Sequence, residues 1–168
     1  MIDTGPPIDS RDRDQLVFFL PKLVVNAGDL SQRVADVHVF APFRLSTAKY
    51  TLLSMLASRP EPPTMTELRH WIMKSSSNLT QLIDGLEGGG LVRRVSDPQD
   101  RRAYRIEITG EGRRLLKKVD AFRQDRMREY LRDYSSEELR TMARLLRRYI
   151  GDCAVLLGMD TTPLPEII

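Results

Sequence analysis

Residues 91–109 interrupt the helical pattern that dominates this chain. On both sides of the segment, apolar residues recur at every third or fourth position, which is the spacing of one face of an α-helix. Inside it, apolar residues from 104 to 108 alternate with charged ones, which is typical of a strand with one buried face. Turn formers at 97–99 separate this strand, expected over 102–109, from a first one over 91–96. One β-hairpin among helices predicts a mainly α fold of the α+β class.

Helices are expected on the N-terminal side of the hairpin. The first covers residues 14–40 and ends at Pro42, while Pro21 either kinks it or marks the first turn of a second helix. Ser46 is the expected N-cap of the next helix, which ends near residue 58. Both boundaries follow from the local chemistry of proline and serine.

Two further helices complete this part of the chain. Thr64 and Glu67 have the spacing of a capping box and predict a short helix over 65–72. Ser75 is the expected cap of a fourth helix, which the glycines at 88–90 end. Three central helices followed by a hairpin form the pattern of a winged helix-turn-helix.

Two long helices are expected after the hairpin. Thr109 caps the first of them, and Ser135 with Glu138 forms a capping box for the second. The apolar stripe of the second is long for the small core that it could serve alone, and the run at 16–20, apolar all round, is expected to be buried against another subunit. We therefore expect the outer helices to form a dimerisation layer.

The chain is accordingly expected to have a winged helix-turn-helix core with long N- and C-terminal dimerisation helices. Its predicted parts are a flexible N-terminal arm (1–12), a helical dimerisation layer (13–43 and 113–160), a winged helix-turn-helix domain (44–112) and a C-terminal tail (161–168).

Charge is distributed unevenly along the chain. Residues 91–132 hold 13 Lys and Arg against 7 Asp and Glu, a net charge of +6, whereas the remainder has a net charge of −3. This concentration fits a surface that faces phosphates, and it fits equally a solvated helix face rich in arginine. No apolar run approaches the roughly 20 residues that span a bilayer, and no secretory pattern opens the sequence, so a cytoplasmic protein is expected.

The residue types offer no catalytic or metal chemistry. Cys153 and two histidines are too few for a structural zinc site, and the glycines at 88–90 lack the flanks of a phosphate-binding loop. No nucleophile is paired with a base, so we expect a protein that is not an enzyme and needs no cofactor. Cys153 lies on the apolar stripe of the last helix, where a buried thiol is inert, which argues against a redox switch.

The helix after Ser75 combines two kinds of face. One is apolar, and the other carries short hydrogen-bonding side chains in its first turns, namely Ser76, Ser77, Asn78, Thr80 and Gln81. Such side chains meet base edges when a recognition helix enters the major groove. They also suit the start of an ordinary surface helix, and this helix alone leaves both interpretations open.

The turn of the hairpin carries Arg101 and Arg102 beside Asp100. An arginine at a protruding tip can enter a narrow minor groove, where the negative potential is enhanced. The Asp100 carboxylate can hold a guanidinium in one orientation through paired hydrogen bonds. A solvated turn with a local ion pair is the alternative.

Together these segments resemble the MarR family of bacterial and archaeal regulators. The residues that carry the resemblance are LIDGLE at 82–87, GLVRR at 90–94, DPQDRR at 97–102 and ITGEG at 108–112, with LSTA at 45–48. The resemblance implies a homodimer, formed through the first and last helices, that binds near-palindromic double-stranded DNA operators, most often as a repressor. Gln81 and Gly85 depart from the pattern, since arginine is frequent at those places in the family.

The resemblance also assigns roles to single residues. It implies that Arg102 enters the minor groove, that Asp100 orients it, and that Arg94 supports the wing or contacts a phosphate. Residues 76–81 match the groove-facing positions of the recognition helix. A winged helix that docks another protein without binding DNA is the alternative function, and it would require an apolar exposed face over 76–86.

Many members of the family release DNA when a small aromatic acid or phenol binds in a cleft between the two layers. Four side chains near the expected region are tentative ligand residues, namely Phe18, His38, Phe43 and Tyr50. Aromatic side chains at helical spacing are more often part of a core, so both interpretations stay open.

Overall fold

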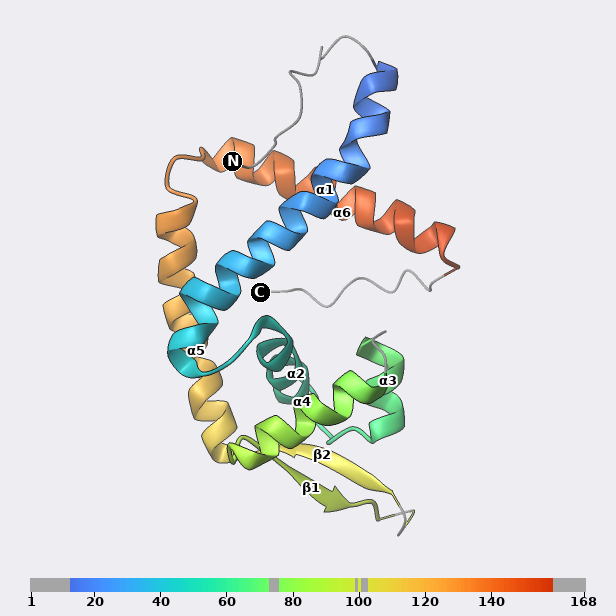
Figure 1. Ribbon diagram of the computed structural model, residues 1–168, viewed down its shortest axis with the longest axis vertical. Helices are drawn as coiled ribbons and strands as arrows, with labels where there is room; N and C mark the ends of the chain where they lie inside the picture. The colour runs from blue at the N-terminus through green and yellow to red at the C-terminus, as the bar shows by residue number, and fades with distance from the viewer. Residues whose placement is uncertain (1–12, 73–75, 99, 101–102, 159–168) are drawn as a thin grey trace. The chain divides into compact units, whose positions relative to one another are not determined.

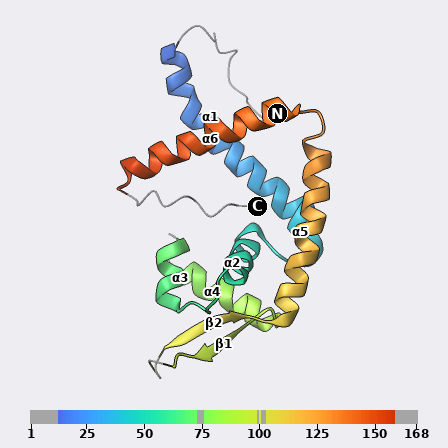
Figure 2. The same ribbon diagram turned by 180° about the vertical axis from the view of Figure 1, so that it is seen from behind.

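The computed structural model describes residues 13–72, 76–98, 100 and 103–158, with no side chains described over 72–78. Its contacts divide the chain into one unit that ends at Gln124 and a second that begins at Asp125. Figures 1 and 2 show the path of the chain from opposite sides.

The first unit opens with one long helical segment. Helix α1 (Arg13–Ala35) continues into a π-helical turn, η1 (Asp36–Phe40), and a 3-10 turn, η2 (Ala41–Phe43). Pro21 lies inside α1, so the interpretation in which it starts a second helix is wrong. The segment also runs past the predicted end at Pro42. Proline is tolerated there because it lies in the first turn of η2, where a backbone N–H would have no acceptor within the helix. It ends at Arg44, whose backbone is left-handed with a φ of 55°.

Helix α1, all of whose residues are described, contains no buried side chain. Val17 is 56% exposed and Phe18 is 77% exposed. The run at 16–20 is therefore mostly exposed in a single chain, and its expected burial against another subunit stays a prediction. Burial begins only in η1, where Val39 and Phe40 enter the core.

Helices α2 (Thr47–Ala57), α3 (Met65–Ile72) and α4 (Ser76–Gly88) lie grouped together in both views (Figures 1 and 2). Two of the predicted caps are confirmed: Ser46 accepts a hydrogen bond from the Lys49 amide, and Thr64 and Glu67 form a capping box. The predicted cap at Ser75 lies outside the described residues. The core side chains of the three helices are Leu52, Leu53, Leu56, Leu68, Leu79, Ile83 and Leu86.

Strands β1 (Val92–Ser96) and β2 (Tyr104–Ile108) form an antiparallel hairpin in which Val92 pairs with Ile108 and Ser96 with Tyr104. Helix α4 contacts β1, and α2 and α3 contact β2. The alternation in β2 is confirmed for Ile106 and Ile108, which are buried, but Tyr104 is 52% exposed. Tyr104 sits in the last pair of the ladder, next to the turn, where the hairpin has the least cover.

Helix α5 (Gly110–Tyr130) starts directly behind the hairpin. The predicted cap is confirmed, because Thr109 Oγ1 accepts a hydrogen bond from the Gly112 amide at 3.0 Å. Gly112 is buried against the carbonyl of Leu91, and a Cβ at this position would overlap that oxygen. Leu116 and Val119 continue the buried face of α5.

The second unit holds the end of α5 and helix α6 (Ser136–Leu156). The capping box of Ser135 and Glu138 is present as predicted. The apolar stripe of α6 has no buried residue, and its exposed members include Met142, Leu145, Leu146 and Ile150. None of the helices in the described part of the chain has the length and apolar character needed to cross a bilayer.

Candidate nucleic-acid interface

Helix α4 presents the two faces that its sequence predicts. Leu79, Ile83 and Leu86 are buried, while Leu82 is only half-buried. Thr80 and Gln81 are exposed, as a pair of base-contacting side chains must be. Ser76, Ser77 and Asn78 form the first turn of α4, but their side chains lie outside the described residues.

The hairpin carries the predicted wing. Asp100 is exposed, and its carbonyl accepts a hydrogen bond from the Ala103 amide at 2.9 Å. The Ala103 carbonyl in turn accepts one from the Asp97 amide at 3.0 Å, which closes the base of the turn. Arg101 and Arg102 lie outside the described residues, so their predicted contacts stay predictions.

An ion pair beside the turn of the wing has no counterpart among the sequence-based predictions. Asp97 is 6% exposed, and its carboxylate lies 2.9 Å from Nε of Arg105. Arg105 Nη1 donates to the carbonyl of Pro62 at 3.0 Å, and the amide of Ile106 donates to Pro63 at 2.8 Å. Nε itself has no aligned hydrogen-bond acceptor among the described residues, so its contact with Asp97 is an ion pair rather than a hydrogen bond. These contacts fasten the hairpin to the segment before α3.

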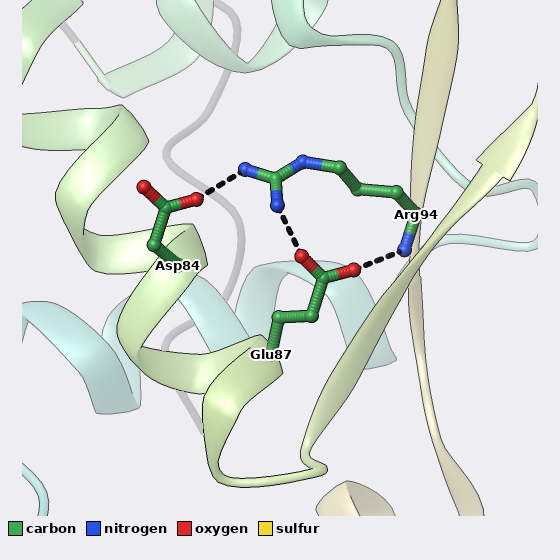
Figure 3. Close-up of polar contacts among 3 residues, drawn as sticks. All are labelled: Asp84, Glu87 and Arg94. Carbon is green, nitrogen blue, oxygen red and sulfur yellow. Dashed lines mark hydrogen bonds and ion pairs between the residues drawn. The ribbon is translucent and has the colours of Figure 1, made fainter.

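A second fastening joins the hairpin to α4 (Figure 3). Arg94 Nη2 donates to the Asp84 carboxylate at 2.5 Å, and Nη1 donates to Glu87. The hydrogen bond with Asp84, together with the negative charge of Glu87, raises the pKa of Arg94 above its ordinary value. Of the two roles that the resemblance left open for Arg94, support of the wing is the one that this geometry favours.

Basic side chains also gather at the start of α5. Arg114, Lys117 and Lys118 are exposed, and Arg113 Nη1 donates to the Ala57 carbonyl at 3.3 Å. These exposed cations lie close together on the helix that follows the wing. They suit phosphate contacts, because such contacts need charge rather than a fixed partner. This part of the predicted basic segment is therefore available to a polyanion.

Two of the predicted ligand residues lie against α5. The ring of Tyr50 stacks on Phe40 at 4.8 Å, and its hydroxyl donates to Asp120 at 2.7 Å and accepts from Arg123 at 3.1 Å. Phe43 meets Phe122 edge to face at 5.4 Å. Desolvation by burial, followed by the hydrogen bond to Asp120, raises the pKa of Tyr50.

The other two predicted ligand residues lie on the first helical segment. His38 is an exposed residue of η1, and Phe18 is exposed on α1 with its ring against Phe19. The aromatic residues of the predicted set thus split between a packed cluster on α5 and exposed positions on the first helical segment.

Comparison with known proteins supports the assignment of the helices and the wing. Residues 45–103 match the model of a family described as the MarR family. The HTH-type transcriptional regulator PecS of Dickeya dadantii is 31% identical over 112 residues, which are 66% of this chain and 68% of PecS. The HTH-type transcriptional repressor YetL of Bacillus subtilis is 28% identical over 128 residues, 74% of this chain and 77% of YetL.

The fold also matches solved structures. A mutant of MarR from E. coli, crystallised in complex with operator DNA, superposes with a TM-score of 0.69 over 82% of this chain and 98% of that one, at 21% sequence identity. Likeness at this level of identity establishes a shared fold, a helical protein with a two-stranded wing and long terminal helices.

Proposed function

This chain belongs to the MarR family of DNA-binding transcriptional regulators, and we propose that it acts as a homodimeric repressor on a near-palindromic operator. In this proposal α4 enters the major groove with Ser76, Ser77, Asn78, Thr80 and Gln81, and the wing reaches the adjacent minor groove with Arg101 and Arg102. Two copies place their α4 helices about 34–36 Å apart, one turn of the duplex. We also propose a cytoplasmic location, because operator DNA lies in the cytoplasm of bacteria and archaea.

The observation that carries the DNA-binding role is the arrangement of α4. Its buried face holds it in the core, while Thr80 and Gln81 are exposed beside a hairpin that is bonded to α4 and to the segment before α3. A module that docks proteins would instead expose apolar side chains on this helix. The polar exposed positions of α4 therefore favour base recognition over protein docking.

The proposed homodimer is supported by the outer helices. Large apolar side chains of α1 and α6 are exposed in the single chain, from Val17 and Phe18 to Leu145 and Ile150. Exposed apolar stripes of this length mark surfaces that associate. Residues 13–43 and 113–160 are accordingly proposed as the dimerisation layer, with 44–112 as the DNA-binding domain.

A mobility-shift titration tests the DNA-binding role. The probe is the tightest duplex recovered by selection from a random-sequence pool, and the wild-type affinity is expected to fall steeply with salt as counterions are released. Arg102→Ala is expected to cost about 1–3 kcal/mol of binding free energy. Arg128→Ala is the control, because Arg128 is 76% exposed and pairs only locally with Asp125. Unchanged affinity in Arg102→Ala would refute the wing assignment, and a wild-type protein that binds no duplex would refute the function.

We further propose that a small aromatic acid or phenol releases the DNA, with Phe43 and Tyr50 as its principal contacts and Phe18 and His38 as secondary ones. The support is the aromatic cluster against α5, which joins a cation, a carboxylate and stacked rings. Salicylate is a suitable probe in the same titration. Release by salicylate in the wild type but not in Tyr50→Ala, which still binds DNA, is the expected result, and equal release from both would contradict the assignment.

A further inference from the structure

Arg94 joins the wing to α4, and the proposed function assigns these two elements to different grooves of the DNA. Asp84 and Glu87 are three residues apart on α4, so both carboxylates point from the same face of the helix. Glu87 accepts the Arg94 backbone amide at 2.9 Å and also Nη1 of the guanidinium, while Asp84 accepts Nη2 at 2.5 Å. Figure 3 shows the guanidinium held between the two side chains. One residue of β1 is thus bound at three points by the last two turns of α4.

The neighbouring arginine on the same strand provides a contrast. Arg93 pairs with Glu107 across the hairpin, so its ion pair stays within the wing. The Arg93 side chain is 64% exposed, whereas that of Arg94 is 30% exposed. Only one of these two arginines therefore connects the wing to the recognition helix.

The charge of the cluster argues against a phosphate contact by Arg94. Two carboxylates surround one guanidinium, so Asp84, Glu87 and Arg94 together carry a net negative charge. Asp84 is 56% exposed, which leaves that negative charge facing solvent. A phosphate approaching Arg94 would also be repelled by this carboxylate.

We propose that Arg94 is a positioning residue that fixes the wing relative to α4, so that the bases under α4 and the flanking bases under the wing are recognised as one unit. The proposal rests on the proposed function. Because the link is rigid, the wing loses no conformational freedom when α4 binds. The contacts of α4 and those of the wing with DNA therefore add to one affinity. Loosening the link is expected to uncouple them without removing either contact.

Arg94→Lys is the decisive variant, because lysine keeps the charge but cannot bridge two carboxylates in a fixed plane. Two probes are compared: the selected duplex, and the same duplex with its flanks replaced so that only the core under α4 remains. The variant is expected to lose affinity for the full duplex on the order of tenfold, the weight of one charge-assisted hydrogen bond. Its affinity for the core duplex is expected to match that of the wild type.

Arg93→Lys is the matched control, since it makes the same substitution one residue away and breaks no link to α4. Asp84→Asn provides an independent test, because it raises the net charge by one and leaves the Glu87 contacts in place. A positioning role predicts weaker binding to the full duplex in Asp84→Asn, whereas a phosphate contact predicts tighter binding. If Arg94→Lys fails to fold, as judged by its melting curve, Asp84→Asn carries the test alone.

The dependence of affinity on salt separates the remaining possibilities. A lost phosphate contact lowers the slope of log affinity against log salt by about 0.9, and a lost positioning contact leaves it unchanged. The proposal is overturned if Arg94→Gln lowers the slope by that amount while Arg94→Lys binds like the wild type. It is also overturned if the variants weaken both duplexes equally. Either result would leave the proposed function standing, whereas a wild type that binds no duplex would remove it.

Discussion

The hydroxyl of Tyr50 in α2 donates a 2.7 Å hydrogen bond to Asp120 in α5, 70 residues further along the chain. Arg123 completes the contact by donating to the same hydroxyl, with its guanidinium 5.5 Å from the ring centre. Helix α2 is thereby tied to α5. A substitution at this contact would therefore affect the packing of both helices.

Removing the hydroxyl with Tyr50→Phe is expected to lower the free energy of unfolding by about 1–2 kcal/mol at neutral pH, because Asp120 and Arg123 each lose a partner. Urea denaturation followed by circular dichroism measures the change. Tyr104→Phe is the control, since Tyr104 is 52% exposed on the hairpin. Equal losses in the two variants would show that the hydrogen bonds of Tyr50 contribute nothing particular.

The difference in stability between the wild type and Tyr50→Phe is expected to depend on pH. Burial raises the pKa of Tyr50 above its ordinary value of 10.0 in the folded protein, so the unfolded chain loses this proton first as the pH rises. The stabilisation is complete below that ordinary value and is lost as the pH climbs toward the folded pKa. The wild type is expected to lose stability relative to Tyr50→Phe in this alkaline range. A constant difference across the range would contradict the assignment.

Asp97→Ala is expected to lower the free energy of unfolding by about 3 kcal/mol, because it leaves the guanidinium of Arg105 without its counterion in a site that is mostly buried. The matched control is Glu107→Ala, which breaks the pair with Arg93 on the exposed side of the same hairpin and is expected to change stability far less. Denaturant titrations of both variants measure the contrast. Similar losses in the two variants would show that the burial of Asp97 does not increase the contribution of its ion pair to stability.

Two glycines of α5 are expected to respond in opposite directions to alanine. In a helix this substitution usually stabilises by up to about 1 kcal/mol, and Gly110, with open space around it, is expected to follow that rule. Gly112→Ala is expected to destabilise by more than about 1 kcal/mol, because the new methyl group would overlap the Leu91 carbonyl. Thermal melting of the two variants gives the comparison, and a stabilised Gly112→Ala would show that α5 can move away from the hairpin.

The dimerisation layer is tested by Leu145→Glu. Leu145 is 50% exposed in the single chain, so the substitution is expected to leave the fold intact, to convert the dimer to a monomer and to weaken operator binding. Light scattering during gel filtration measures the mass. Arg147→Glu, about half a turn away on α6, is the control and is expected to stay dimeric. A dimeric Leu145→Glu that binds DNA normally would move the interface elsewhere.

Much of the architecture could be predicted because it depends on local chemistry. The caps at Ser46, Thr64, Thr109 and Ser135 each rest on a side chain that bonds to an amide three residues away, and this spacing is visible in the sequence. The hairpin followed from its alternation in the same way. Such features need no knowledge of the tertiary structure.

The features that escaped prediction depend on distant partners. Asp97 was assigned to a turn and Arg105 to an exposed strand position, yet the folded hairpin places them together against Pro62. Asp84 and Glu87 had no assigned role until the structure brought Arg94 between them. Their signal was present in the spacing of two acids on one helix face, but the direction of the hairpin relative to α4 was needed to interpret it.

The π-helical turn at Asp36–Phe40 determines the rotational phase of α1 relative to the core. A π turn holds one more residue than an α turn, so it shifts the angular register of the preceding helix by about 100°. Deleting one of the two exposed residues at 37 and 38 would restore an unbroken α-helix and rotate the apolar stripe of α1 away from its present direction. The stripe would then no longer face a partner that docks on it, although Val39 and Phe40 would remain in the core.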